Sequence, residues 1–184
     1  MKKMLCLLGL FVVLSACEQT TKSKVKLDAY FDLDSLLDQQ ILQLNERGVT
    51  LLKTVTMDGM AENRTESPDT SGWNEEFIII RDFNLNKAYY VGSYARLDLE
   101  DGFEYHLEDD IKAPVSSFRV TERDGSLAEI QASYFEDKTI FQHKRDLKIT
   151  FVNQLIKTYQ ISGYQKMVMK DTIFYTISGE IAYE

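Results

Sequence analysis

Residues 172–183 read TIFYTISGEIAY, a segment in which apolar and polar side chains alternate. The apolar positions on one side are Ile173, Tyr175, Ile177 and Ile181, and the polar positions on the other are Thr172, Thr176 and Glu180. Successive side chains of a β-strand point to opposite faces of its sheet. The segment is therefore predicted to be a strand with one buried face.

Similar segments occupy the chain before it, and short turn sequences separate them. Strands are predicted at 94–99, 103–107, 115–121, 127–135, 139–151 and 156–170. The turn sequences are Glu100-Asp101-Gly102, Arg123-Asp124-Gly125, Asp137-Lys138 and Lys170-Asp171. Earlier in the chain, strands 49–57 and 61–65 flank Asp58-Gly59, a pair that favours a tight hairpin. Consecutive hairpins of this kind indicate an antiparallel meander.

Two segments have helical rather than strand periodicity. In residues 32–47, apolar side chains recur three or four positions apart at Leu33, Leu36, Leu37, Ile41 and Leu44. Asp32 or Asp34 suits the N-cap of this helix, and Gly48 suits the position after its last turn. The preceding Tyr30 and Phe31 are expected to fold back onto the same core. A second helix is predicted over residues 72–83 from the spacing of Trp73, Phe77, Ile80 and Phe83.

These elements predict an α+β fold, in which the N-terminal helix and a second short helix pack on a multi-stranded antiparallel meander sheet. The chain has 184 residues, of which 44% are hydrophobic, and this suits one globular domain. We divide it into a signal peptide at 1–16, a polar tether at 17–26 and the domain at 27–184. Most of the Phe and Tyr side chains are expected in the core.

The amino terminus has the three parts of a secretory signal. Lys2 and Lys3 are followed by an apolar run at 4–14, which is too short to span a membrane as an ordinary helix. Leu14-Ser15-Ala16-Cys17 then provides small residues and a thiol. The alternative interpretations are an ordinary cleaved signal with a chance cysteine and a short buried helix. Cys6 lies within the apolar run and would leave with it, so the mature protein would have neither a disulfide nor a cysteine nucleophile.

Leu14-Ser15-Ala16-Cys17 resembles the lipobox of bacterial lipoproteins, and the whole chain is similar to small lipoproteins of Bacteroidota. Further resemblance lies in the helix ending Leu44-Asn45-Glu46-Arg47-Gly48, in Thr54-Val55-Thr56-Met57-Asp58-Gly59, in the Trp73 segment, in Val91-Gly92-Ser93-Tyr94 and in the hairpins around Arg123-Asp124-Gly125. The resemblance implies a diacylglyceryl and acyl (palmitate-type) anchor on Cys17 and a cell-envelope location. Glu18 in place of an aspartate favours the outer membrane, on its periplasmic face or at the surface. No catalytic residue or cofactor is carried over.

The charge of the chain restricts its partners. The formal net charge is −8, and no basic stripe interrupts it. Such a chain repels phosphate backbones, so nucleic acid is not expected as a partner. It would also not adhere to an anionic bilayer by its overall charge, and lipid on Cys17 is the expected attachment.

Candidate site residues are few. Glu104, His106 and Asp110 are near one another in sequence and could bind a metal, but Glu104 and His106 also fit the solvated face of a strand. We therefore assign no metal ligand, catalytic residue or cofactor. His143 is expected in an exposed bend at 142–146, and no Gly-x-Ser-x-Gly motif supports a serine triad. Asp171-Thr172-Ile173 fits a Bacteroidota O-glycosylation pattern, with Thr172 as the acceptor.

Three functions are compatible with these features. The first is a non-enzymatic envelope module that binds a protein or glycan partner. The second is a carrier or sensor of an apolar ligand in a groove between sheet and helices. The third is a hydrolase with an unrecognised site near Glu104, His106 and Asp110. The sequence favours them in that order.

Overall fold

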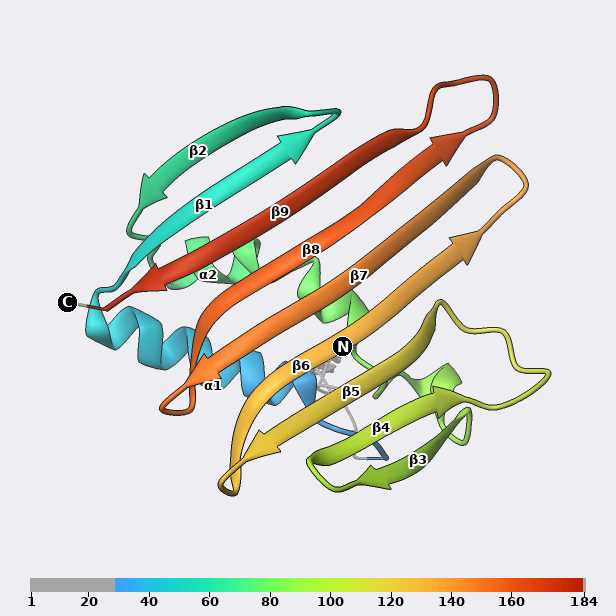
Figure 1. Ribbon diagram of the computed structural model, residues 1–184, viewed down its shortest axis with the longest axis horizontal. Coiled ribbons are helices and arrows are strands. Elements are labelled where there is room, and N and C mark those ends of the chain that lie inside the picture. Colours follow the sequence, from blue (N-terminus) through green and yellow to red (C-terminus); the bar gives the residue numbers. More distant parts are fainter. Residues whose placement is uncertain (1–28, 184) are drawn as a thin grey trace, which may run out of the picture.

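The computed structural model describes residues 29–183, and Figure 1 shows them as one broad antiparallel sheet. The sheet has nine strands in the order β2-β1-β9-β8-β7-β6-β5-β4-β3. The strands are β1 (Thr50–Met57), β2 (Met60–Glu66), β3 (Tyr94–Leu99), β4 (Gly102–Leu107), β5 (Val115–Arg123), β6 (Ser126–Asp137), β7 (Phe141–Val152), β8 (Leu155–Met167) and β9 (Ile173–Ala182).

The predicted meander is confirmed, because β3 to β9 follow one another in both the chain and the sheet. The β1–β2 hairpin joins this meander at its end, where β1 pairs with β9 from Thr50↔Ala182 to Met57↔Tyr175. Asp58 and Gly59 connect β1 to β2 with φ angles of 48° and 84°, as the Asp-Gly sequence predicts. Strands β5 and β6 extend one or two residues further than predicted. In contrast, β7 begins two residues later, β8 ends three residues earlier, and β9 is one residue shorter at each end.

Helix α1 (Leu33–Arg47) has the caps that its sequence predicts. The Asp32 carboxylate accepts a hydrogen bond from the Ser35 backbone N–H at 3.0 Å, and Gly48 follows the helix in the left-handed conformation. Its apolar stripe is buried, with Leu33, Leu37 and Leu44 fully inaccessible to solvent. Tyr30 and Phe31 pack on the same core, as expected.

The second helix is shorter than predicted. Helix α2 covers only Thr70–Glu76, begins at the Asp69 cap and ends before the three consecutive isoleucines. β-branched side chains restrict their own rotamers against the preceding helical turn, which weakens helix continuation there. The chain proceeds through a turn into the 3₁₀ helix η1 (Ile80–Phe83) and later into η2 (Ala88–Tyr90). The predicted apolar contacts survive this change, because Trp73, Phe77, Ile80 and Phe83 are all buried.

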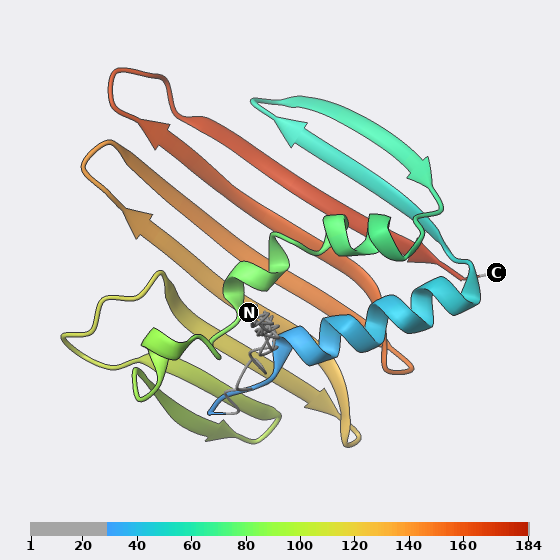
Figure 2. The same ribbon diagram turned by 180° about the vertical axis from the view of Figure 1, so that it is seen from behind.

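The helical segments lie together against one face of the sheet (Figure 2). The core between the two layers is rich in aromatic side chains, including Trp73 and Phe77 with ring centroids 5.5 Å apart. The α+β prediction is therefore confirmed in its antiparallel sheet and only in part for its helices, which make up a small share of the fold. Within residues 29–183, no helix is both long and apolar enough to cross a membrane.

The structure corrects the prediction for His143. This residue lies inside strand β7, opposite Gln165 of β8, and not in an exposed bend. The sequence at 142–146 resembles a turn because both faces of β7 are polar there. Gln142, Lys144 and Asp146 point away from the helices, while His143 and Arg145 bond Tyr175 and Asp82 on the helix side. The true turn after β7 is Asn153-Gln154, where both residues have positive φ angles of 52° and 64°.

Candidate functional site

The candidate site lies on the face of the sheet that carries no helix, which is the nearer face in Figure 1. Every second side chain of each strand points to this open face. One cross-strand row on it is formed almost entirely by short polar residues. Strand pairing aligns Thr56 with Thr176, Thr176 with Ser162, Ser162 with Asp146, Asp146 with Ser133, and Ser133 with Ser117.

We call these six residues the hydroxyl row, since five of them carry hydroxyl groups. The row crosses β1, β9, β8, β7, β6 and β5 without interruption. At a strand spacing of about 4.8 Å, its six members extend over roughly 24 Å. Each hydroxyl can both donate and accept a hydrogen bond, and Asp146 adds a charged acceptor. The row is therefore a long, nearly flat surface for polar recognition.

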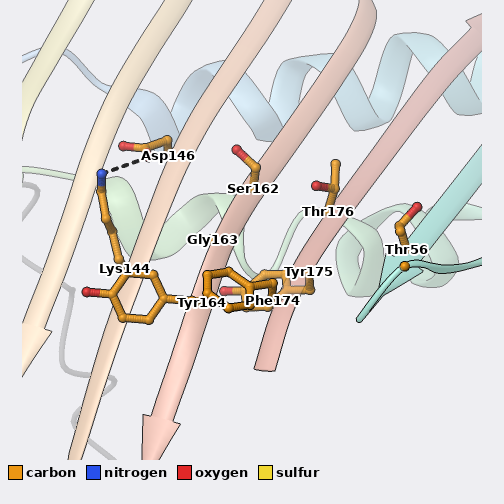
Figure 3. Close-up of a pocket in the computed structure, with 10 residues that line it drawn as sticks. Thr56, Lys144, Asp146, Ser162, Gly163, Tyr164, Phe174, Tyr175 and Thr176 are labelled. Atoms are coloured by element: carbon orange, nitrogen blue, oxygen red, sulfur yellow. Dashed lines mark ion pairs between the residues drawn. The ribbon is translucent and has the colours of Figure 1, made fainter. Parts of the chain in front are cut away.

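Two adjoining hollows follow the hydroxyl row. The first has a volume of about 390 Å³, and Figure 3 shows Thr56, Thr176 and Ser162 beside Lys144 and Asp146 at its lining. The second has a volume of about 340 Å³ and continues toward β5 and β4. Asp146 and Ser162 line both hollows, so these residues mark the centre of the site.

Asp146 is held in place by its neighbours. Its carboxylate accepts a hydrogen bond from the Ser133 hydroxyl at 2.8 Å and forms an ion pair with Lys144 at 3.4 Å. About half of the Asp146 side chain stays exposed, so the carboxylate remains available to a ligand. A fixed, half-solvated carboxylate of this kind suits hydrogen bonding to a neutral polar ligand.

An aromatic pair lies beside the first hollow. The rings of Tyr164 and Phe174 have centroids 6.0 Å apart, and Phe174 is 60% exposed. Both residues line the hollow together with the hydroxyl-bearing side chains (Figure 3). The first hollow thus combines apolar ring surface with hydrogen-bonding groups, which is the usual composition of a small-molecule site.

Polar groups on the helix side of the same strands contact one another and not the open face. The His143 ring and the Tyr175 hydroxyl are 2.6 Å apart, while Arg145 is 5% exposed and bonds Asp82 at 2.8 Å. Burial, followed by the charge of Arg145, lowers the pKa of His143, although Glu136 and Asp82 oppose this effect. His143 therefore belongs to the interior side and does not face the hydroxyl row.

A buried carboxylate supports the sheet from α2. Glu76 accepts a hydrogen bond from the Tyr159 hydroxyl and forms an ion pair with Lys53 at 2.5 Å. Burial raises the pKa of Tyr159, and the hydrogen bond and negative charge of Glu76 raise it further. The phenol therefore stays protonated and donates to the carboxylate. This contact fixes α2 against strands β1 and β8.

The residues singled out from the sequence are placed as follows. Glu104 and His106 lie two apart on β4, with His106 Nε2 3.3 Å from Glu104 Oε1, and Glu104 lines the second hollow. Asp110 lies after the strand at an exposed turn with a φ of 66°. No group of three or more His, Cys, Asp or Glu side chains within residues 29–183 is arranged to hold a metal ion. Thr172 is half-buried just before β9, and Cys17 lies outside the described residues.

Sequence reasoning missed the hydroxyl row. Each strand shows its polar alternation in the sequence, as in Thr158, Gln160 and Ser162 of β8. The row itself depends on the register of six strands, and single-strand patterns do not define that register. His106 pairs with Ser117 and so lies at the far end of the row.

No known protein family, curated protein or solved structure matches this chain.

Proposed function

We propose that this protein is a lipid-anchored module of the bacterial cell envelope, attached through Cys17, and that it binds a glycan on its open sheet face. The hydroxyl row is the observation that carries the binding part of the proposal. A glycan presents hydroxyl groups at regular intervals along an extended chain, and a row of hydroxyl side chains some 24 Å long matches that arrangement. The partly exposed ring of Tyr164 and the exposed ring of Phe174 offer an apolar surface for a sugar ring.

The chemistry of the two faces favours this function over an apolar-ligand carrier. The space between sheet and helices contains large side chains that are 0–1% exposed, among them Trp73, Phe77 and Phe118. The open face, in contrast, presents polar groups in two solvent-accessible hollows. A polar ligand is therefore better matched by this molecule than an apolar one.

The arrangement of the site favours binding over hydrolysis. Ser162 is central to the hydroxyl row, while His143 points to the opposite face of the sheet. His106 has Glu104 beside it but lies at the end of the row, on the outer part of the face. Nucleophilic catalysis by serine needs an adjacent general base, most often a histidine, and neither His143 nor His106 is placed beside Ser162.

The anchor rests on Leu14-Ser15-Ala16-Cys17 and on the apolar run before it. Two or three acyl chains on one residue hold a protein stably at a membrane. Mass spectrometry of the native protein is expected to find a chain that begins at Cys17 and carries acyl groups. An unmodified Cys17 or an uncleaved first segment would contradict the anchor without affecting the glycan site.

Binding is tested with the complete native protein in detergent and with two probes: soluble peptidoglycan fragments and the polysaccharide released from lipopolysaccharide. Calorimetric titration is expected to detect binding of one of them. Asp146→Asn should weaken that binding by about 10-fold or more, because it removes a charged acceptor at the centre of the row.

The matched control is Asp109→Asn, an exposed residue beyond the end of β4. It makes the same chemical change outside the hydroxyl row and should leave the affinity unchanged. Equal losses in both variants, or no binding of either probe, would refute the glycan site. A pull-down that instead recovers a protein held through Asp146 would replace the glycan with a protein partner.

A further inference from the structure

The hairpin ends at residues 137–142 and 166–171 form an apolar surface apart from the open-face site. The β6–β7 and β8–β9 hairpins both turn at this end of the sheet, and they extend beyond the helical layer (Figures 1 and 2). Their exposed apolar side chains include Ile140 at 64%, Val168 at 58% and Met169 at 100% exposure. We call this surface the hairpin tips.

The two hairpin tips are joined and act as one surface. The Val168 backbone N–H donates to the Ile140 carbonyl at 3.0 Å, although these residues belong to different hairpins. A groove of about 580 Å³ lies between them, lined by Asp137–Gln142 and Lys166–Lys170. The neighbouring β1–β2 turn is also attached, since Asp58 N–H donates to the Phe174 carbonyl at 2.9 Å.

Further exposed apolar side chains surround the hairpin tips. Exposed side chains at the same end of the sheet are Met57, Met60, Phe135, Met167 and Ile173. Elsewhere on the described surface, exposed apolar residues such as Leu42, Ile78 and Leu97 belong to separate elements. A concentration of exposed apolar side chains at one end of a molecule marks an interaction surface.

The hairpin tips do not share the acidic excess of the whole chain, although Lys138 is paired with Glu136 at 3.3 Å. The two segments carry three lysines, Lys138, Lys166 and Lys170, against two aspartates, Asp137 and Asp171. The complete chain has 21 basic and 29 acidic residues. Lysine side chains beside apolar tips can bury their stems while keeping the ammonium groups near lipid headgroups. Apolar tips flanked by the exposed Lys166 and Lys170 therefore complement an anionic lipid surface.

We propose that the hairpin tips insert into an anionic lipid surface, giving the protein a membrane contact of its own. This contact does not depend on lipid at Cys17 or on the glycan site. It would hold the sheet with its strands steeply inclined to the membrane, because the tips lie at the ends of β6, β7, β8 and β9 (Figure 1).

The test uses tryptophan fluorescence of the full chain with vesicles of phosphatidylglycerol whose acyl chains are brominated. The natural Trp73 is fully buried in α2, so it reports little contact with lipid. Met169→Trp places a second tryptophan at the hairpin tips. Val152→Trp is the matched control, since Val152 is 52% exposed at the hairpin on the opposite end of the sheet.

The brominated lipid is expected to quench Met169→Trp emission about twofold or more relative to the Val152→Trp protein, since bromine quenches only rings that enter the acyl region. Adding Ile140→Asp and Val168→Asp to Met169→Trp should abolish this difference, with circular dichroism showing that the fold is kept. Vesicles of phosphatidylcholine should quench less than phosphatidylglycerol vesicles.

Three results would contradict insertion of the hairpin tips into lipid. Equal quenching at both positions would mean that the protein touches lipid without a preferred end. Protein that floats with the vesicles but shows no Met169→Trp quenching would be held by the Cys17 anchor alone. A doubled mass in solution, lost with Ile140→Asp and Val168→Asp, would assign the hairpin tips to a second copy of the chain.

Discussion

Glu76 shows how one carboxylate can hold two layers together. It lies at the end of α2, is 8% exposed, and contacts Lys53 of β1 and Tyr159 of β8. The sequence gives no sign of this role, because the adjacent Glu75 has the same chemistry and points to solvent. Only the position of each residue on the short helix distinguishes them.

Glu76→Gln is expected to destabilise the protein by about 1–2 kcal/mol. The substitution keeps an acceptor for Tyr159 but removes the charge paired with Lys53, which is partly exposed and therefore partly screened. Urea unfolding followed by circular dichroism measures the change. Glu75→Gln is the control and should alter the free energy of unfolding by no more than about 0.5 kcal/mol. Similar losses in both variants would contradict the assigned role of Glu76.

His143 makes the stability of the protein depend on pH. Its pKa is lowered in the folded state by burial and by Arg145, so the unfolded chain binds a proton more readily. As the pH falls below about 6.5, the unfolded state therefore binds protons before the folded state does. The free energy of unfolding decreases over this range, until the pH reaches the lower pKa of His143 in the folded state. The stability contributed by neutral His143 is therefore complete only above the unfolded-state pKa of about 6.5.

His143→Gln is expected to reduce the slope of unfolding free energy against pH between about 7.5 and 5.5. The measurement is a series of urea unfolding curves across this range. His106→Gln should keep the slope, because His143 is still present. A His143→Gln protein with the same pH dependence as the natural chain would show that other groups cause it.

At the scale of elements, Gln40 connects α1 to the turn between β7 and β8. Its side chain is 2% exposed, and its amide donates to the Gln154 carbonyl while its carbonyl accepts from the Ile156 N–H, each at 2.9 Å. The Asn153-Gln154 turn cannot pair these groups within its own hairpin. The helix therefore fixes the hairpin through one polar residue of an otherwise apolar stripe.

Gln40→Leu is expected to cost about 2–4 kcal/mol, since it leaves a buried N–H and a carbonyl without partners. Chemical denaturation gives the free energy, and hydrogen exchange should show faster exchange at the Ile156 amide. Gln39→Leu, an exposed neighbour, serves as the control and should change neither measurement. Unchanged exchange at Ile156 in Gln40→Leu would disprove the connection.

Helices α1 and α2 and the β1–β2 hairpin show which structural features the sequence can predict. The caps of α1 and the Asp58-Gly59 hairpin depend on residues adjacent in the chain, and both predictions are confirmed. The second helix was predicted from apolar spacing alone, and this spacing does not distinguish a continuous helix from α2 followed by η1. Its isoleucines, Ile78 to Ile80, were the local signal against a long helix.

At the scale of the whole molecule, the sequence predicted the meander but not the candidate site. Hairpin order follows from turn residues, which are local. The hydroxyl row needs the register of six strands, and pocket geometry depends on that register. His143 was misplaced for the same reason, because a polar run in a long strand resembles a turn when its partners are unknown.

The pairing of β1 with β9 has a consequence for how the protein is made. The two strands lie at nearly opposite ends of the chain, with Thr50 facing Ala182. The β1–β2 hairpin can therefore join the meander only after β9 has been synthesised. Contacts of such long sequence separation form slowly. The topology therefore delays completion of the sheet relative to the local hairpins of the meander.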